Sequence, residues 1–253
     1  MGNEVLEYGS DVLLTPAINI QRDPLCGRNF EYYSEDPYLS GKLAAGFIRG
    51  VEGQGVGTSL KHFAANSQEL SRFTSDSVLD ERTLRELYLT GFEIAVKEGK
   101  AKSIMSSYNE VNGIYANENS HMLQEILVDE WGFDGLVVTD WASSTEMIAH
   151  GFAADSKEVA MKAVNAGVDM EMVGNTFVKE LPGLIKEGKV KEAEIDNAVR
   201  NILRIKYRLG LFENPYVDEK ANVLYAPSHL EAAKQAATES AILLKNDHET
   251  LPL

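Results

Sequence analysis

The feature that most constrains the fold is an alternation of short apolar runs with longer amphipathic segments along the 253-residue chain. Each run is too short for a helix, and most are rich in residues that favour strands buried on both faces. The runs span residues 11–16, 57–62, 103–108 and 135–140, with a weaker one at 168–172. Strands that alternate with helices predict right-handed βαβ units and a parallel sheet, either a barrel or a doubly wound sheet.

The segments between these runs carry recognisable helix-start signals. Asp36 followed by Pro37 predicts an N-cap with proline at the first helical position. The other expected starts are Asp80, Ser120, and two pairs with capping-box spacing, Ser143 with Glu146 and Asp155 with Glu158. A long helix is expected to close at Gly210, and after a loop over 213–227 a last helix runs from Ser228 to about Lys245.

The charge balance argues against two classes of partner. The chain has 24 Lys and Arg against 39 Asp and Glu, for a net charge of -15. This excess repels phosphate backbones and anionic lipid, so we expect neither a nucleic-acid nor a membrane partner. Cys26 is the single cysteine and cannot form an internal disulfide. Residues 1–4 lack the basic start of a signal peptide, which favours a cytoplasmic location.

Polar and aromatic residues follow each predicted strand. In parallel α/β folds the active site gathers at the carboxyl ends of the strands. These ends carry Asn19 with Arg22, Lys61 with His62, Tyr108 with Asn109, Asp140 with Trp141, and Glu171. Cations, carboxylates and aromatic rings are what a sugar site needs, because hydroxyls take polar partners while the C–H face of the ring stacks on aromatics. The sequence therefore predicts a carbohydrate site at this edge.

Individually, these residues allow more than one interpretation. Asp140 is placed as a glycosidase nucleophile, but the position also suits a helix N-cap or a metal ligand. His62 could be a core histidine, and Lys61 a surface cation with a buried stem. Arg28 could clamp vicinal hydroxyls, or could pair with Glu31 or Glu35 to hold its loop.

Four segments, taken in order, strongly resemble glycoside hydrolase family 3, and most closely its β-glucosidase/β-xylosidase branch. They are Gly-Arg-Asn-Phe-Glu-Tyr-Tyr-Ser-Glu-Asp-Pro at 27–37, Leu-Lys-His-Phe-Ala-Ala-Asn at 60–66, Met-Ser-Ser-Tyr-Asn-Glu-Val-Asn-Gly at 105–113 and Trp-Gly-Phe-Asp-Gly-Leu-Val-Val-Thr-Asp-Trp at 131–141. The resemblance covers nearly the whole chain. It implies a TIM-like (β/α) barrel domain over residues 1–212, and a linker and helix at 213–253 that lead toward a second α/β sandwich domain.

The resemblance also implies roles for individual residues. The chain is expected to serve a retaining exo-β-glycosidase that removes terminal non-reducing β-D-glucosyl residues, with Asp140 as the nucleophile that forms a covalent glycosyl ester. The implied sugar-binding residues are Arg28, Lys61, His62, Arg72 and Tyr108, with Trp141 as a wall of the site. No metal and no cofactor are implied. The His/Asp loop of the N-acetylglucosaminidase branch is absent after Lys61-His62, which disfavours that activity.

Two departures from the family pattern concern the ends of the chain. The family's barrel begins with further strands, one of which carries an Asp for the outer sugar hydroxyls, so we expect the barrel to lack its first strands here. The general acid/base Glu of this branch comes from the second domain. We therefore expect the missing strands and C-terminal domain to be partners of these residues, and the 253 residues alone to be weakly active or inactive.

Other functions remain open at this stage. Within the family, the activity could be that of a β-xylosidase or of mixed specificity. In another class of barrel enzyme, Lys61 could form a Schiff base as in an aldolase, or Asp140, Asp169 and Glu171 could hold Mg²⁺ as in a lyase. The chain could also be a non-catalytic sugar-binding fragment.

Overall fold

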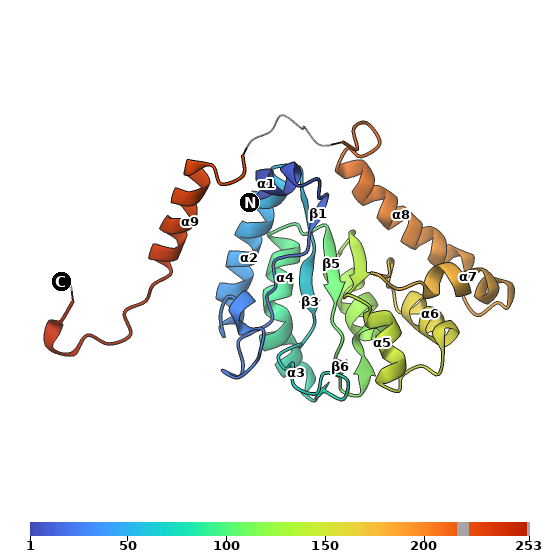
Figure 1. Ribbon diagram of the computed structural model, residues 1–253. Coiled ribbons are helices and arrows are strands. Elements are labelled where there is room, and N and C mark those ends of the chain that lie inside the picture. The colour runs from blue at the N-terminus through green and yellow to red at the C-terminus, as the bar shows by residue number, and fades with distance from the viewer. Residues whose placement is uncertain (217–222, 252–253) are drawn as a thin grey trace.

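The computed structural model describes residues 1–216 and 223–251 (Figure 1). The helices are α1 (Gly2–Glu7), α2 (Pro37–Glu52), α3 (Glu81–Thr83), α4 (Thr90–Lys97), α5 (Ser143–Ala149), α6 (Ser156–Asn165), α7 (Thr176–Lys186), α8 (Glu192–Arg208) and α9 (Pro227–Glu239). Leu84–Leu89 and His121–Glu130 are π-helical, and Asn29–Glu31, Ala116–Glu118 and Asp247–Glu249 are 3-10 turns. The strands are β1 (Val12–Leu13), β2 (Gly57–Thr58), β3 (Leu60–Phe63), β4 (Asp76–Ser77), β5 (Ser103–Ser106), β6 (Glu110–Val111), β7 (Ile114–Tyr115) and β8 (Leu136–Thr139).

The five predicted strands lie side by side in chain order, and all their pairings are parallel. β1 pairs with β2, and β3, β5 and β8 are neighbours in that order. Parallel bridges from Ala17 to Lys61 and from Val138 to Met170 add the remaining neighbours. Helices follow the strands along the chain and flank them in Figure 1. The α/β class and the parallel order are therefore confirmed.

Three of the predicted N-caps are confirmed by their hydrogen bonds. The Asp36 carboxylate accepts from the backbone amides of Tyr38 and Leu39 at the start of α2. Asp80 caps α3 in the same way, and Asp155 accepts from the amide of Glu158 at the start of α6. A side-chain oxygen satisfies amides that have no partner within the helix, which fixes where each helix begins.

Two sequence expectations for helix ends are wrong. Ser143 is not a cap but the first residue of α5, after Ala142 in the left-handed region at φ 58°. Its hydroxyl accepts from Asn117 instead, and Glu146 pairs with Arg72. Helix α9 ends at Glu239 rather than near Lys245. The Ser240 hydroxyl donates to the Ala237 carbonyl, a local bond that competes with helix continuation, and the helix has no buried face to extend.

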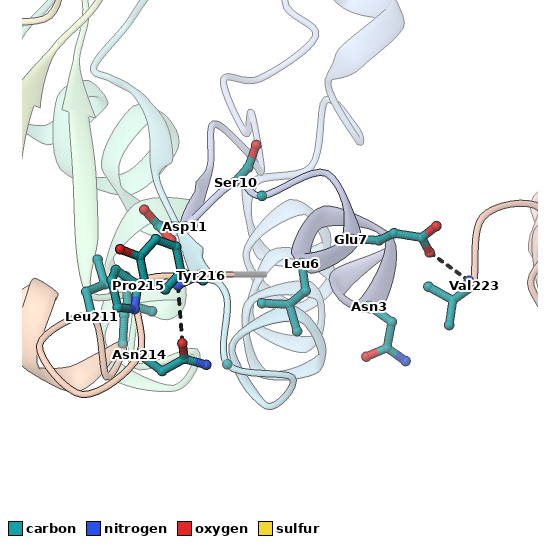
Figure 2. Close-up of a pocket in the computed structure, with 13 residues that line it drawn as sticks. Asn3, Leu6, Glu7, Ser10, Asp11, Leu211, Asn214, Pro215, Tyr216 and Val223 are labelled. Atoms are coloured by element: carbon teal, nitrogen blue, oxygen red, sulfur yellow. Dashed lines mark hydrogen bonds between the residues drawn. The ribbon is translucent and has the colours of Figure 1, made fainter. Parts of the chain in front are cut away.

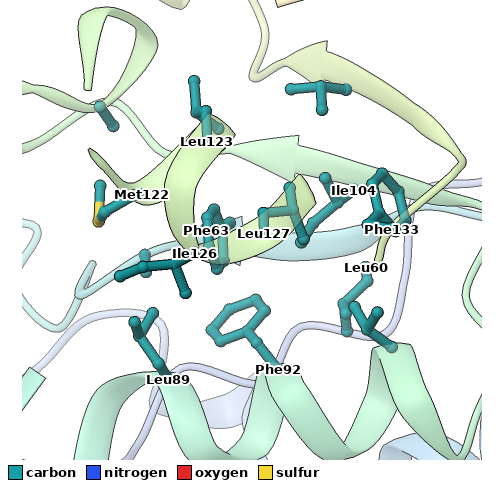
Figure 3. Close-up of a cluster of buried hydrophobic side chains, with 14 of the residues drawn as sticks. Leu60, Phe63, Leu89, Phe92, Ile104, Met122, Leu123, Ile126, Leu127 and Phe133 are labelled. Carbon is teal, nitrogen blue, oxygen red and sulfur yellow. The ribbon is translucent and has the colours of Figure 1, made fainter. Parts of the chain in front are cut away.

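The core lies between the sheet and the helices that cover it (Figure 3). Side chains of the π-helical segment at 121–130 meet those of β3, β5 and α4 there. The fully buried members include Leu60, Phe63, Phe92, Ile104, Met122, Leu123, Ile126 and Leu127. The Phe63 ring packs edge-on against the Phe92 ring, with centroids 5.3 Å apart. This packing holds the strand that carries Lys61 and His62.

Helix α9 stands apart from the sheet in Figure 1, and its start is tied to α1. The Glu7 carboxylate accepts from the backbone amides of Val223 and Leu224, and His229 lies 3.0 Å from Glu4. No residue of α9 is buried. Over the residues that the structure describes, no helix is long and apolar enough to cross a membrane.

Candidate active site

Parallel order brings the predicted site residues to one edge of the sheet. Lys61 and His62 lie in β3, Tyr108 follows β5 by two residues, and Asp140 directly follows β8. Because these strands are parallel neighbours, their carboxyl ends lie together. Arg28 reaches the same edge from the loop before the Asn29–Glu31 turn. The structure thus gathers residues that are up to 112 positions apart in the sequence, from 28 to 140.

The side chains of Asp140 and His62 face each other in the site, each through one polar atom. The Asp140 Oδ2 atom lies 3.6 Å from His62 Nε2. Both atoms are buried and neither has a hydrogen-bond partner among the described residues. Buried polar atoms without partners are uncommon in proteins, and a bound ligand is one way to satisfy them.

The orientation of His62 is set by Asn19. Asn19 Oδ1 accepts from the His62 backbone amide at 2.9 Å and lies 3.2 Å from the ring Nδ1, while its Nδ2 donates to the His62 carbonyl at 2.8 Å. An amide oxygen can only accept, so Nδ1 carries the proton and Nε2 is a bare acceptor. Burial, together with the charges of Arg28 and Lys61, holds the pKa of His62 well below its usual value. A neutral His62 can therefore accept a hydrogen bond from a hydroxyl.

Opposing influences act on the Asp140 carboxyl group. Burial raises its pKa, whereas the Trp141 backbone amide, which donates to Oδ1 at 2.6 Å, lowers it. The positive charges of Arg28, Lys61 and Arg72 also lower this pKa. These cations favour the carboxylate form that a nucleophile requires, although burial leaves the pKa raised overall.

The cations are held by two glutamates that the sequence analysis did not assign to the site. Glu31 accepts from Arg28 Nε at 2.5 Å and lies 3.5 Å from Lys61 Nζ. Glu69 accepts from the Tyr108 hydroxyl at 2.5 Å and lies 3.7 Å from Arg28 Nε. Arg28 also donates to the Tyr108 hydroxyl at 3.1 Å. The pairing of Arg28 with Glu31, one of the two readings of its loop, is confirmed.

Tyr108 stays neutral in this cluster. Burial and the hydrogen bond to Glu69 raise its pKa to about 12. Its ring lies under the Arg72 guanidinium, whose central carbon is 4.0 Å from the ring centroid. Trp141, predicted as a wall of the site, is 64% exposed beside Asp140. Contacts or charges thus connect six of the predicted site residues, which are Arg28, Lys61, His62, Tyr108, Arg72 and Asp140.

The alternative magnesium site is not formed by the residues proposed for it. Both Glu171 oxygens accept hydrogen bonds from Thr176 at the start of α7, from its amide at 2.8 Å and its hydroxyl at 2.9 Å. The Ser144 hydroxyl of α5 also donates to Glu171, at 2.7 Å. Asp169 accepts from the Val137 amide and the Asn201 side chain. No group of three or more metal-ligating side chains occurs within residues 1–216 and 223–251. Asp169 and Glu171 therefore have structural partners instead of converging on Asp140.

A cavity of about 400 Å³ lies at the opposite edge of the sheet (Figure 2). Its lining comes from α1 and from the segments before β1 and β2, together with residues that follow α8. The Glu7 carboxylate and the Val223 amide close one side of it. None of the predicted site residues lines this cavity, so it is separate from the Asp140 cluster.

Comparison with known proteins identifies the class of this chain. Residues 1–205 match the glycosyl hydrolase family 3 N terminal domain. The chain is 42% identical to beta-glucosidase B of Emericella nidulans and 43% identical to thermostable beta-glucosidase B of Acetivibrio thermocellus. It is also 38% identical to an exo-alpha-(1->6)-L-arabinopyranosidase of Bifidobacterium longum. The chain therefore belongs to glycoside hydrolase family 3, which confirms the resemblance.

Solved structures of the family agree with this assignment. Beta-glucosidase from Listeria innocua in complex with glucose matches with a TM-score of 0.93 at 34% identity, over all of this chain and 36% of that one. Beta-glucosidase 3B from Thermotoga neapolitana in complex with alpha-D-glucose matches with a TM-score of 0.86 at 43% identity, over all of this chain and 34% of that one. The chain covers 29% and 31% of the Emericella and Acetivibrio enzymes. It thus spans about a third of the length of its relatives.

Proposed function

We propose that this chain carries the nucleophile and the sugar-orienting residues of a retaining exo-β-glycosidase that acts on terminal non-reducing β-D-glucosyl residues. The observation that carries the proposal is the unpartnered Oδ2 of Asp140, placed at a strand end beside a bare His62 Nε2. A carboxylate oxygen free of donors keeps its lone pairs for attack on an anomeric carbon.

The proposed reaction proceeds in two displacements. The Asp140 carboxylate forms a bond to the anomeric carbon while the bond to the aglycone oxygen breaks, and a general acid gives that oxygen a proton. Water then attacks the anomeric carbon of the glycosyl ester, and the bond from that carbon to the Asp140 oxygen breaks, which frees the carboxylate. The former general acid, now a base, removes the proton from the attacking water. Arg28, Lys61 and Arg72 stabilise the carboxylate, and His62 accepts from a sugar hydroxyl.

The general acid is proposed to come from polypeptide outside this chain. Such a group must lie about 5–5.5 Å from the nucleophile on the leaving-group side. The carboxylates that the structure places in the cluster, Glu31, Glu69 and Glu146, are each engaged with a cation or a tyrosine. Since the relatives are about three times as long, we propose that residues 1–212 belong to a TIM-like barrel completed by further strands. We also propose that residues 213–253 lead to a second α/β domain that supplies the acid.

A different terminal sugar is the second candidate. It is favoured by the 38% identity to the arabinopyranosidase of Bifidobacterium longum. Rates on the 4-nitrophenyl glycosides of β-D-glucose, β-D-xylose and α-L-arabinopyranose would separate these activities. The highest kcat/KM on the glucoside is expected, whereas a preference for either pentoside would reassign the substrate.

The nucleophile is tested by trapping. A 2-deoxy-2-fluoro-β-glucoside slows hydrolysis of the ester, so the intermediate accumulates on the attacking carboxylate. Peptide mapping of the labelled complete protein is expected to place the sugar on Asp140. A label on Glu31, Glu69 or Glu171 would overturn the assignment.

Residues 1–253 expressed alone should bind glucose but turn over cellobiose far more slowly than the complete protein, by roughly 10²–10⁴-fold for lack of an acid.

A further inference from the structure

Arg72 is a cation of the cluster that, like Arg28, comes from an irregular loop. It lies between β3 and β4, in a stretch without helix or strand, and its predecessor Ser71 has a positive φ of 56°. An arginine side chain has many rotamers, so a loop position alone does not fix a guanidinium group in a site. The structure nevertheless holds the Arg72 guanidinium over one face of the Tyr108 ring, 4.0 Å from its centroid.

The element that holds Arg72 is helix α5. Glu146 Oε1 accepts from Arg72 Nη2 at 2.7 Å. Glu146 is only 17% exposed and Arg72 34%, so solvent screens this pair less than it screens a surface ion pair. One turn further along, the Phe73 ring packs edge-on against His150, with centroids 5.5 Å apart. The loop therefore touches the helix through two neighbouring residues.

Helix α5 is itself firmly anchored to the catalytic strand. It begins three residues after Asp140, and the Ser143 amide donates to the Asp140 carbonyl at 3.1 Å. The Ser143 carbonyl accepts from the Tyr115 hydroxyl at 2.9 Å, and its hydroxyl accepts from Asn117 at 3.0 Å. Any charge carried by α5 is therefore fixed relative to the nucleophile.

We propose that Glu146 is a positioning residue that fixes the Arg72 guanidinium over Tyr108 and thereby sets the affinity of the site for its terminal sugar. This inference rests on the proposed function, since it takes Arg72 as a sugar-binding residue. Glu146 acts only through Arg72. Its capping-box spacing with Ser143 has no capping role, because α5 has no side-chain cap and the Glu146 carboxylate is turned to Arg72.

The test is a double-mutant cycle in the complete protein, with KM for a 4-nitrophenyl β-glucoside and the inhibition constant of glucose as readouts. Glu146→Gln is expected to raise both about three- to ten-fold, which lies in the lower part of the range of coupling between residues in contact. In an Arg72→Ala background the same substitution should change neither constant. A variant that merely lost folded protein would lower kcat and leave KM and the inhibition constant unchanged.

Two further variants sharpen the test. Glu146→Asp keeps the charge on a shorter side chain and should fall between the wild type and Glu146→Gln. Glu110→Gln is the matched control, since Glu110 lies 3.8 Å from His150 but is not paired with Arg72, and it should leave both constants unchanged. Equal effects of Glu146→Gln with and without Arg72, or no effect on KM, would overturn the inference while the wild type remained active. Failure of the proposed function would show instead as a wild type that neither hydrolyses the glucoside nor binds glucose.

Discussion

Two neighbouring strands of this molecule end in acidic residues, and their carboxylates differ in the hydrogen-bond donors that the protein gives them. Asp140 follows β8, and Asp169 and Glu171 flank the neighbouring bridge residue Met170. Among the residues that the structure describes, one buried oxygen of Asp140 has no hydrogen-bond partner, and neither has the nearby His62 Nε2. Asp169 and Glu171, in contrast, have donors on both oxygens. A carboxylate saturated by the protein stabilises the fold, whereas one left unsaturated in a buried cluster is available to a ligand.

The local backbone explains the difference. After Asp140 the chain turns through Ala142 into α5. Among the described residues, the Trp141 amide is the only hydrogen-bond donor to the Asp140 carboxylate. After Glu171 the chain folds back, and the first amides of α7 point at the carboxylate. Gly174 makes this possible, because a Cβ there would lie 1.9 Å from Glu171 Oε1.

The largest effect is expected on the unsaturated side. Asp140→Asn in the complete protein should lower kcat by about 10³-fold or more, because an amide oxygen is a poor nucleophile and the neighbouring Glu31, Glu69 and Glu146 are engaged with a cation or a tyrosine. Thermal unfolding should stay within a few degrees of the wild type, since the change removes no carboxylate partner except the Trp141 amide. If the variant kept more than a tenth of the wild-type kcat, Asp140 would not be the nucleophile, and the functional contrast between the two strand ends would be refuted.

The saturated side should respond in stability instead. Glu171→Ala removes an acceptor for four donors, two amides of α7 and the hydroxyls of Ser144 and Thr176. We expect the free energy of unfolding to fall by about 2–4 kcal/mol, the range for loss of a helix cap with charged hydrogen bonds. Urea denaturation measures this, with Glu171→Gln as a control that keeps one acceptor oxygen and loses less. An unchanged midpoint would mean that Glu171 is not structural.

A third prediction concerns the cations of the Asp140 cluster. Arg28→Ala should lower kcat/KM by roughly ten- to a hundred-fold, because hydrogen bonds from charged donors contribute about 1.5–3 kcal/mol each. Both limbs of the pH–rate profile should persist, since Arg28 is proposed to orient the sugar without transferring a proton. Arg28→Lys keeps the charge but not the fork that joins Glu31 and Tyr108, so it should recover part of the loss. Loss of one limb would assign Arg28 to proton transfer.

Particular residues show how much of the fold and of the site could be predicted from the sequence. Apolar runs and strand order predicted the edge on which Lys61, His62, Tyr108 and Asp140 meet, because parallel strands place their ends together. The caps at Asp36, Asp80 and Asp155 were readable because they act within four residues. Glu69 and Glu146 were missed as partners of the site, and Glu31 was expected to pair with Arg28 but not with Lys61, because these contacts join residues 30 to 74 positions apart. Spacing carries no information on such contacts, and Ser143 with Glu146 even imitated a local cap.

The same limit applied to the acidic residues that follow the sheet. In sequence, Asp140, Asp169 and Glu171 could all be ligands of a metal, although only Asp140 was placed as a nucleophile. What separates them is the set of donors aimed at each carboxylate, and most of those donors come from other elements. Val137, Asn201 and Ser144 lie 32, 32 and 27 positions from the carboxylates that they contact.

The smallest expected effect is a pH dependence of stability that comes from Asp169 on the saturated side. Burial raises the pKa of Asp169 to about 6, against an ordinary value of 3.8, even though Val137 and Asn201 donate to it. The folded chain therefore holds a proton that the unfolded chain releases, and the stability that this contributes is complete below pH 3.8 and is lost as the pH rises through 6. Between pH 5 and 7 the free energy of unfolding should fall by about 1 kcal/mol from this group alone.

Asp169→Asn should remove that slope, as measured by urea denaturation across the window. Asp134→Asn is the matched control, because the hydrogen bond from Arg208 lowers the pKa of Asp134 and places its titration below the window. If wild type and Asp169→Asn gave parallel curves from pH 5 to 7, Asp169 would be ionised throughout, and its contribution to stability would come from its hydrogen-bond partners and not from a bound proton.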